Sequence, residues 1–262
     1  MNQRDKARIF RDLHSGPVLV LPNAWDVASA RLVERAGAAA VATTSAGVSW
    51  SLGAADGGNL DRTSAIEAIA RISDAVDVPV TADIEGGYSQ HLDELAAVVR
   101  AVVAAGAVGV NFEDSASGAL LSVQDQSARL AVVREAAGSD LFVNARTDVY
   151  LFGAGTVDET LHRAQAYLAA GADGIFVPGA ADATTIGKLV NGIAGPLNVM
   201  VGPGALTVGE LADLGVARVS VGQAIAQAAY ALTSQAATEL VTSGTYDTLA
   251  DGLPYATLNA LF

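Results

Sequence analysis

The sequence contains no cysteine and no long hydrophobic run among its 262 residues. The absence of cysteine excludes disulfide bonds, metal sites built on thiolates and a cysteine nucleophile. No apolar run approaches the roughly 18 residues that a membrane-spanning helix requires. The first residues, MNQRDKARIFRDLHSG, have mixed charge and lack the apolar region of a secretory signal. We therefore expect a cytoplasmic protein without a membrane partner.

Basic residues are also scarce, with 15 Lys and Arg against 28 Asp and Glu, which gives a formal net charge of −13. A surface of this sign repels a phosphate backbone, and no stripe of Lys or Arg offers a local exception, so we expect no nucleic-acid partner. The hydrophobic content of 51% is sufficient for one large core in a chain of this length. We expect a single domain over residues 1–262.

A glycine followed four residues later by Val or Ile occurs at four joints, each after a stretch rich in Ala and Leu. The pairs are Gly37 and Val41, Gly106 and Val110, Gly171 and Ile175, and Gly215 and Val219. A glycine just past a helix supplies the left-handed conformation that ends it, and a β-branched run is typical of a buried parallel strand. Each joint therefore predicts a helix followed by a strand.

Further apolar runs, each long enough for one strand, lie between these joints. They are Pro17–Leu21, Val78–Ala82, Leu141–Ala145 and Pro196–Met200. The helical segments that separate most of the runs are Leu60–Ala75, Leu92–Ala105, Gln124–Ala137 and Asp158–Ala170. Strands that alternate with helices in this way predict an α/β fold, a (β/α)8 TIM barrel. A doubly wound sheet is the alternative, but it usually has fewer strands, and no Gly-x-Gly-x-x-Gly turn follows the first strand.

Polar residues gather at the ends of the first five predicted strands, where the active site of such a barrel lies. They include Asn23, Asp26, Thr44, Asp56, Asp83, Glu85, Asn111, Glu113, Asn144, Arg146 and Asp148. Asp83 and Glu85 are two residues apart, a spacing that turns both side chains to one face of a strand. Two like charges so placed require a compensating cation, and oxygen ligands without Cys or His favour Mg²⁺, with Mn²⁺ as the alternative.

The order of the motifs TTSAG, LGAAD, ADIEGGY, NFED and NARTD resembles the isocitrate lyase/phosphoenolpyruvate mutase superfamily over nearly the whole chain. The resemblance implies a Mg²⁺ ion at the barrel mouth that binds a small 2-oxo acid or its enolate. It implies a metal shell of Asp56, Asp83, Glu85 and Glu113, with Asp83 as the direct ligand. It implies that the loop Thr44, Ser45, Ala46 and Gly47 binds the substrate carboxylate, and that the catalytic residues are Asp56, Glu113 and Arg146, of which Arg146 contacts the substrate anion.

The same resemblance implies a homodimer or a homotetramer, in which a C-terminal helix is often exchanged between subunits. Residues 240–262 form the expected C-terminal helical tail. The apolar segment Leu253–Phe262 at its end suits that exchange.

The chain departs from the family pattern after the fourth strand. The lyases carry Lys-(Lys/Arg)-Cys-Gly-His there, whereas Ser115–Gln126 contains no Cys, Lys or His, and Pro178 stands where the mutases have a histidine. Isocitrate cleavage by the usual route and phosphonate mutase activity are therefore disfavoured. The favoured function is Mg²⁺-dependent cleavage of a C–C bond in a 2-oxo acid such as oxaloacetate. The alternatives are a P–C bond enzyme of phosphonopyruvate hydrolase or mutase type, and a non-catalytic binder of 2-oxo acids.

The remaining polar residues have structural interpretations. We expect Asp26, Asp114 and Asp148 to cap helices or support the site rather than to bind metal. We expect Asn198 to be a hydrogen-bonded amide of the core. The histidines lie on predicted helices or loops away from the strand ends and are expected at the surface: His14, His91 and His162.

Overall fold

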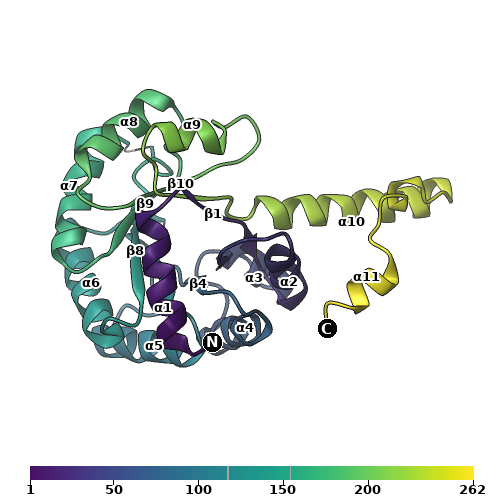
Figure 1. The fold of residues 1–262 in the computed structure, drawn as a ribbon, viewed down its shortest axis with the longest axis horizontal. Helices are drawn as coiled ribbons and strands as arrows, with labels where there is room; N and C mark the ends of the chain where they lie inside the picture. Colours follow the sequence, from purple (N-terminus) through teal and green to yellow (C-terminus); the bar gives the residue numbers. More distant parts are fainter. Residues whose placement is uncertain (117, 154) are drawn as a thin grey trace.

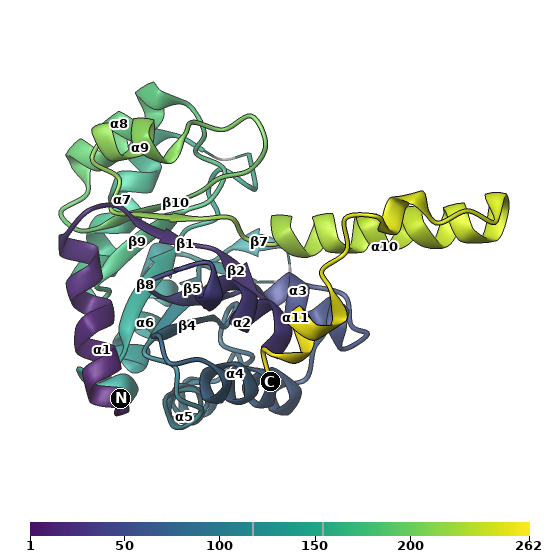
Figure 2. The same ribbon diagram turned by 45° about the vertical axis from the view of Figure 1, so that its right-hand side comes forward.

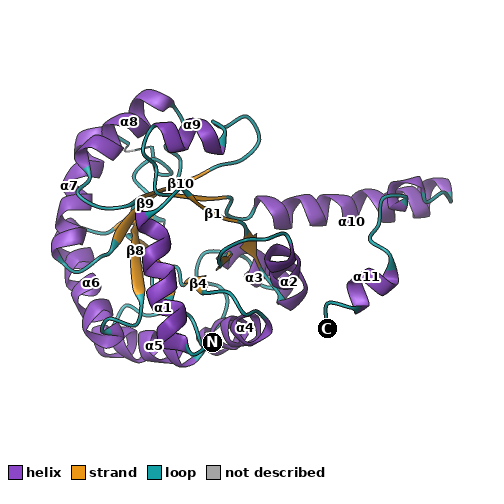
Figure 3. Cartoon of the chain, in the orientation of Figure 1, coloured by secondary structure: helices purple, strands orange, loops and turns teal. Residues whose placement is uncertain are grey.

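The computed structural model describes residues 1–116, 118–153 and 155–262. Within them, nine parallel strands form a nearly closed barrel surrounded by helices (Figures 1 and 3). The strands are β1 (Leu19–Leu21), β2 (Asn23–Ala24), β3 (Val41–Thr43), β4 (Val80–Asp83), β5 (Gly109–Glu113), β8 (Phe142–Arg146), β9 (Gly174–Val177), β10 (Leu197–Met200) and β11 (Arg218–Ser220). The predicted (β/α)8 TIM barrel is confirmed, because β1 and β2 are two parts of one barrel strand.

This first barrel strand is divided at Pro22, which has no backbone N–H to donate. Its first part, β1, pairs with β11, and its second part, β2, pairs with β3. The Asn23 Oδ1 atom accepts hydrogen bonds from the backbone N–H groups of Val221 (3.0 Å) and Gly222 (2.9 Å). The divided strand therefore joins both edges of the sheet and closes the barrel.

Helices follow the strands, and most of them cover the outside of the barrel (Figure 3). They are α1 (Gln3–Asp12), α2 (Val27–Arg35), α3 (Ser45–Ser51), α4 (Arg62–Ala75), α5 (Leu92–Ala104), α6 (Val123–Ala137), α7 (Val157–Ala169), α8 (Ala183–Gly192), α9 (Val208–Asp213), α10 (Ala224–Ser243) and α11 (Tyr255–Asn259). The 3₁₀ turns η1 (Leu13–Ser15) and η2 (Asp247–Leu249) follow α1 and α10. None of the helices in the described ranges has the length and apolar character needed to cross a membrane.

Local chemistry sets both ends of these helices. Side-chain oxygens accept hydrogen bonds from first-turn N–H groups at Asn2, Asp26, Asp61, Ser122, Thr156, Asp182 and Thr207. The four predicted joint glycines have φ values of 91° (Gly37), 93° (Gly106), 108° (Gly171) and 90° (Gly215). Residues with a Cβ rarely adopt such values. The predicted joints between helix and strand are therefore confirmed.

Helix α1 closes the amino-terminal end of the barrel. Phe10 is fully buried and meets the ring of Phe142 edge to face at 5.8 Å between centroids. The His14 ring stacks on Phe142 at 3.9 Å, and its Nδ1 atom lies 2.8 Å from the Phe10 carbonyl oxygen. Burial, with the charge of Arg218, lowers the pKa of His14 to about 4. The prediction that His14 lies at the surface is wrong, because η1 folds its ring against the barrel floor, whereas His91 and His162 are exposed as expected.

One carboxylate at the same end is bound by two arginines. Asp173 accepts a hydrogen bond from Arg11 Nη1 at 2.5 Å and another from Arg134 Nη2. It also accepts the backbone N–H of Val143 at 2.8 Å. We refer to Asp173, Arg11 and Arg134 as the floor triad. It ties α1 and α6 to the start of the strands.

Helix α10 does not pack along the barrel but extends away from it (Figures 1 and 2). Ala226 is its buried residue, while Leu232, Leu240 and Val241 are 50%, 56% and 84% exposed. After α10 the chain reverses, and Glu239 accepts the backbone N–H groups of Asp247 and Thr248 at 2.8 and 2.9 Å. The arm formed by α10 and α11 thus starts at Ala224, and the predicted tail 240–262 begins inside the last turn of α10.

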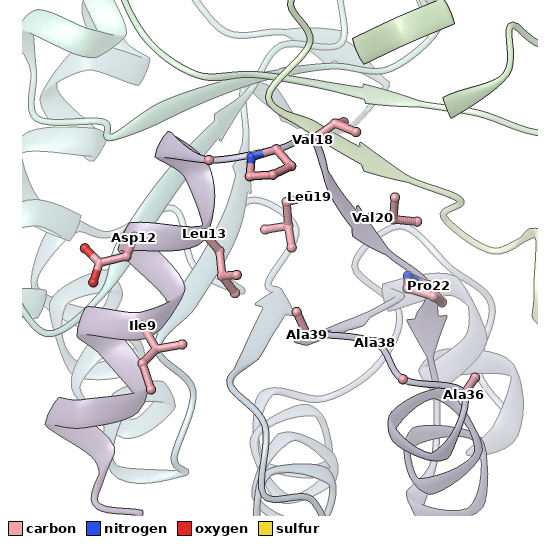
Figure 4. A pocket seen from close by; sticks show the side chains of 13 residues that line it. Ile9, Asp12, Leu13, Val18, Leu19, Val20, Pro22, Ala36, Ala38 and Ala39 are labelled. Carbon is pink, nitrogen blue, oxygen red and sulfur yellow. The ribbon is translucent and has the colours of Figure 1, made fainter. Parts of the chain in front are cut away.

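An apolar groove of about 670 Å³ lies beside β1 (Figure 4). Val20 lines it from β1 and Val18 from the position just before that strand. Ile9 and Leu13 line it from α1 and η1, and Ala39 lines it from the joint before β3. Val20 is 41% exposed, although both of its strand neighbours are buried. A (β/α)8 barrel normally covers its outer face with helices, and this groove is a part of that face where Val20 of β1 remains exposed.

Candidate active site

The strand register brings two of the predicted acids, Asp83 and Glu113, and the arginine to one edge of the barrel. Asp83, at the end of β4, pairs with Asn111 of β5, and Glu113, at the end of β5, pairs with Arg146 of β8. Because the strands are parallel, these residues meet at the carboxyl end of the barrel. Side chains far apart in the sequence thereby form one cluster.

Arg146 is the cation at the centre of this cluster. Its Nη1 atom lies 3.0 Å from Glu113 Oε2 and 3.7 Å from Asp83 Oδ2. Its Nε and Nη2 atoms donate to the two oxygens of Asp148 at 2.6 and 3.2 Å, and its guanidinium lies over the Phe176 ring. Burial by itself lowers the pKa of Arg146, but the charges of Glu113, Asp83 and Asp148 raise it above the ordinary value. Arg146 is therefore permanently charged.

Glu85 reaches the cluster from a strained turn. Strand β4 ends at Asp83, and Glu85 has a φ of 49°, in the left-handed region that is costly for a residue with a Cβ. Its backbone N–H donates to Asp83 Oδ1 at 3.2 Å. The expected proximity of Asp83 and Glu85 is present, but the reason given for it, alternation along one strand, is wrong. The turn rather than the pleat brings Glu85 to the site.

The carboxylates carry more negative charge than Arg146 neutralises. Burial raises the pKa of Asp83. Burial, followed by the charges of Asp83 and Asp56, raises the pKa of Glu85 to about 7. Burial also raises the pKa of Glu113 to about 8, against the opposing effect of Arg146. Asp56 itself lies in an exposed turn between α3 and α4. Uncompensated acids of this kind favour a further cation or protons.

The predicted carboxylate-binding loop turns into a short helix that the sequence analysis did not anticipate. Thr44 precedes α3, and Ser45, Ala46 and Gly47 form its first turn. The Ser45 hydroxyl donates to Asp83 Oδ2 at 3.3 Å. A Cβ at Gly47 would lie 2.8 Å from the Cβ of Trp25, closer than side-chain atoms pack. Glycine is required here because the loop lies directly against Trp25.

Aromatic residues hold the start of the arm beside this loop. Tyr230 of α10 packs on Trp25 and Trp50 with ring centroids 6.5 and 6.2 Å apart. Both tryptophans therefore pack between the loop and the arm. Asp26, as expected, caps a helix: its Oδ1 accepts the Ser29 N–H at 2.7 Å at the start of α2.

The barrel interior below the acids is polar. Asn144 Nδ2 donates to Asn111 Oδ1 at 2.9 Å and to Asn198 Oδ1 at 3.1 Å. Asn198 also donates to the Arg218 carbonyl and the Ser220 hydroxyl, each at 3.2 Å, so the expected core amide is confirmed. Arg218 is 1% exposed and donates to Asn111 Oδ1 at 3.1 Å. The sequence analysis missed this buried cation, since Arg218 lies in an apolar run.

Residues 10–241 match the protein family described as phosphoenolpyruvate phosphomutase. The chain belongs to this family. The resemblance found in the sequence motifs is thereby confirmed, and homologues in the isocitrate lyase/phosphoenolpyruvate mutase superfamily are enzymes.

Individual members of the superfamily align with most of the chain. The uncharacterized protein Rv1998c of Mycobacterium tuberculosis H37Rv is 39% identical over 96% of this chain and 95% of its own. The oxaloacetate decarboxylase of Paraburkholderia xenovorans LB400 is 30% identical over 77% of this chain and 70% of its own.

Solved structures show the same relationship. A crystal structure from Burkholderia cenocepacia J2315 shares 37% identity with a TM-score of 0.93 and covers 98% of this chain and 95% of its own. A phosphonopyruvate hydrolase solved with oxalate and Mg²⁺ shares 25% identity with a TM-score of 0.87 and covers 98% of this chain and 94% of its own.

The acids of this phosphoenolpyruvate phosphomutase family member suit a hard cation. All the donors are carboxylate oxygens, and burial first, with neighbouring carboxylates second, raises the pKa values of Asp83, Glu85 and Glu113. In the part of the chain that the structure describes, no three His, Cys, Asp or Glu side chains form a closed metal cluster. Mg²⁺ does not require one, since it usually keeps several waters and binds one or two carboxylates. The residues present therefore fit a Mg²⁺ ion bound by one or two of these carboxylates.

The loop that departs from the family pattern is short and partly paired. Of residues 115–126, the structure describes all but 117, and β6 (Ser115–Ala116) pairs with β7 (Ala119–Leu120) before Ser122 caps α6. The Ser115 Oγ atom lies 2.8 Å from Asp148 Oδ2 and 3.1 Å from Glu113 Oε1. The sequence analysis noted only that the loop contains no Cys, Lys or His and did not single out this hydroxyl, which the family motifs do not mark.

Proposed function

We propose that this protein is a Mg²⁺-dependent lyase that cleaves a C–C bond of a small 2-oxo acid, with oxaloacetate as the first substrate to test. The observation that carries the proposal is the cluster at the barrel mouth, where the partly buried Arg146 stands among Asp83, Glu113 and Asp148, and burial raises the pKa of the first two. Such a cluster can take up a divalent cation and an anionic substrate together. The oxaloacetate decarboxylase named above supports the choice of substrate.

In this proposal Asp83 holds the metal directly, and Asp56, Glu85 and Glu113 complete its shell. The phosphonopyruvate hydrolase solved with oxalate and Mg²⁺ supports the choice of ion. When bound, Mg²⁺ supplies positive charge that stabilises negative charge developing on the 2-oxo oxygen. The raised pKa of Glu113 indicates that its charge is costly without that ion.

The residues of the chain bind and orient the substrate. Thr44, Ser45, Ala46 and Gly47 receive the carboxylate next to the 2-oxo group, and Arg146 receives the second anionic group. With oxaloacetate, the bond between C3 and C4 breaks, CO₂ leaves, and the electron pair forms the enolate of pyruvate. Water supplies the proton that C3 then takes up. Asp56, Glu113 and Arg146 form the catalytic group that surrounds the reacting atoms.

The test is turnover of oxaloacetate and phosphonopyruvate in parallel, with and without Mg²⁺, corrected for spontaneous decarboxylation by the metal. Pyruvate formed from oxaloacetate without phosphate release, and lost in Asp83→Ala, is the expected result. Phosphate release from phosphonopyruvate would instead establish the P–C bond enzyme that the phosphonopyruvate hydrolase relative suggests. Saturable binding of oxalate with Mg²⁺ but no turnover of either acid would establish a non-catalytic binder.

We also propose that two copies of the chain exchange the arm formed by α10 and α11, in a homodimer or homotetramer. The groove beside β1 is apolar and exposes Val20, while the arm exposes Leu232, Leu240 and Val241. Apolar surfaces of this extent favour burial against each other, and in the extended arm they lie away from the barrel (Figure 2). The partner's α10 would then cover the groove beside β1.

Light scattering on the full-length chain tests the exchange. Val20→Asp places a charge in the groove and should reduce the measured mass to that of a monomer. Leu92→Asp is the matched control, because Leu92 is 43% exposed at the first position of α5, where an aspartate is favourable. A monomeric wild type, or an unchanged mass of the Val20 variant, would contradict the exchange.

A further inference from the structure

Asp114 is a fully buried carboxylate directly behind the proposed site, and it accepts hydrogen bonds from two different elements. Its Oδ2 atom accepts from Tyr167 Oη at 2.7 Å and from Arg163 Nη1 at 3.1 Å, both on α7. The same oxygen accepts from Thr147 Oγ1 at 2.8 Å, and Oδ1 accepts from the backbone N–H of Asp148 at 2.9 Å. Arg163 balances the buried charge, so Asp114 is a satisfied anchor rather than an unpaired acid.

These bonds hold the segment just after β8. The backbone N–H of Asp114 donates to the Arg146 carbonyl oxygen at 3.0 Å. Together with the bonds to Thr147 and Asp148, Asp114 contacts three consecutive residues of this segment. The segment is therefore fixed relative to α7, although neither Asp114 nor α7 reaches the site itself.

The fixed segment in turn orients the arginine. Asp148 is 2% exposed and accepts from Arg146 through Nε and Nη2, which leaves Nη1 directed toward Glu113 and Asp83. Without the hydrogen bonds to Asp148, the attraction of Glu113 and Asp83 would move the whole guanidinium toward these two acids. The arginine would then compete with a cation for those acids and turn away from a bound anion.

We propose that Asp114 is a positioning residue for Arg146, acting through Thr147 and Asp148. The inference rests on the proposed function only in assigning a substrate anion to Arg146. Tyr167 and Thr147 belong to the same positioning device, because each donates to the carboxylate of Asp114. Asp148 is the part of the device that touches the arginine.

The test uses substitutions that remove a single donor and keep the shape. Thr147→Val and Tyr167→Phe each delete one hydroxyl that donates to Asp114, and Thr147→Ser retains it. The first readout is hydrogen exchange of the Arg146 Nε–H group by ¹⁵N NMR without ligand, with the signal assigned by its loss in Arg146→Lys. We expect exchange to be about tenfold faster in the valine and phenylalanine variants and unchanged in Thr147→Ser.

The second readout is calorimetric binding of oxalate in the presence of Mg²⁺. The valine and phenylalanine variants should bind oxalate about tenfold more weakly, and their Kd for Mg²⁺ alone should rise as well, because the released guanidinium competes with the cation for the acids. Asp173→Asn in the floor triad is the matched control, because it weakens a comparable carboxylate at the opposite end of the barrel and should move neither readout.

The two proposals fail separately. A wild type that binds no oxalate would contradict the proposed function, while the exchange of the Arg146 Nε–H group would still decide the positioning role. If that exchange stays within twofold of wild type in both Thr147→Val and Tyr167→Phe, the positioning role is wrong. A loss of stability that is equal in Thr147→Ser and Thr147→Val, with no change in exchange, would show that Thr147 is merely structural.

Discussion

The two ends of the barrel balance their charges in opposite ways. At the amino-terminal end, the carboxylate of Asp173 is held by two arginines, Arg11 and Arg134. At the carboxyl end, the single guanidinium of Arg146 stands among three carboxylates, and the pKa of Glu113 rises to about 8. One end is electrostatically satisfied and closed by α1, whereas the other is left short of positive charge. At the amino-terminal end, the paired charges stabilise the fold. At the carboxyl end, the carboxylates that have no cationic partner can bind ligands.

The largest expected effect is a loss of activity, and it should follow from a substitution at the carboxyl end of the barrel. Asp83→Ala should lower kcat/KM for oxaloacetate by about a thousandfold, because it removes the proposed direct ligand of the metal. The same substitution should not lower the free energy of unfolding without metal, because it relieves repulsion among buried acids. Turnover assays and urea titrations of the same preparation measure both quantities. Turnover within tenfold of wild type would contradict the role given to Asp83.

Addition of Mg²⁺ should stabilise the fold through the carboxyl end alone. At a concentration of about 100 times its Kd, a ligand that binds only the folded state adds about 2.7 kcal/mol to the free energy of unfolding. Thermal unfolding with Mg²⁺ and with EDTA measures the shift. It should persist in Asp173→Asn and vanish in Asp83→Ala. A shift retained in Asp83→Ala would place the ion elsewhere.

Acid should weaken the amino-terminal end through His14. Its pKa in the folded protein is about 4, below the value of 6.5 expected when it is unfolded. The unfolded state therefore takes up a proton first as the pH falls, so the contribution is complete above pH 6.5 and is lost down to pH 4. Between pH 7 and pH 5 the loss attributable to His14 should be about 2 kcal/mol.

Urea titrations of wild type and His14→Phe across this range isolate that contribution. Phenylalanine keeps the ring that stacks on Phe142 but cannot take up a proton. The stability difference between the two proteins should therefore change with pH in favour of the variant as the solution is acidified. A difference that is constant between pH 7 and pH 5 would show that the pKa of His14 is the same in the folded and unfolded states.

The smallest effect concerns the floor triad. Asp173→Asn should lower the free energy of unfolding by about 1.5 kcal/mol, because both arginines lose a charged acceptor but remain partly exposed to water. Its kcat/KM at 25 °C should equal that of wild type. Chemical denaturation and the oxaloacetate assay check the two statements. An Asp173→Asn variant that is as stable as wild type but inactive would show that the amino-terminal end serves activity rather than stability.

Much of the fold follows from local sequence patterns. The joint glycines and β-branched runs predict strands such as β5 and β9, because both signals depend on residues within one helical turn of each other. The convergence of Asp83, Glu113 and Arg146 follows too, since residues at the ends of parallel strands meet at one edge of the barrel. Local rules and the known geometry of the barrel suffice for these features.

Features that depend on tertiary contacts were not accessible in this way. The burial of His14 requires Phe142, and the anchor at Asp114 requires Tyr167, a residue 53 positions away. The left-handed conformation falls on Glu85 itself, a residue with a Cβ, whereas the sequence marks the turn only at the following Gly86 and Gly87. The outward direction of α10 could not be predicted from the sequence. Hydrophobic periodicity indicates that a segment is helical but not the direction in which the helix leaves the barrel.

The division of the first strand at Pro22 has a consequence for the order of events during synthesis. The segment Leu19–Leu21 emerges from the ribosome early, yet its hydrogen-bonding partner is Arg218–Ser220, near the end of the chain. The segment must therefore wait, with its apolar residues unpaired, until almost all of the protein has been made. Contacts this distant in sequence form slowly. The strand that is translated first is thus the last to take its place, and nascent chains that stall before residue 218 have an open barrel.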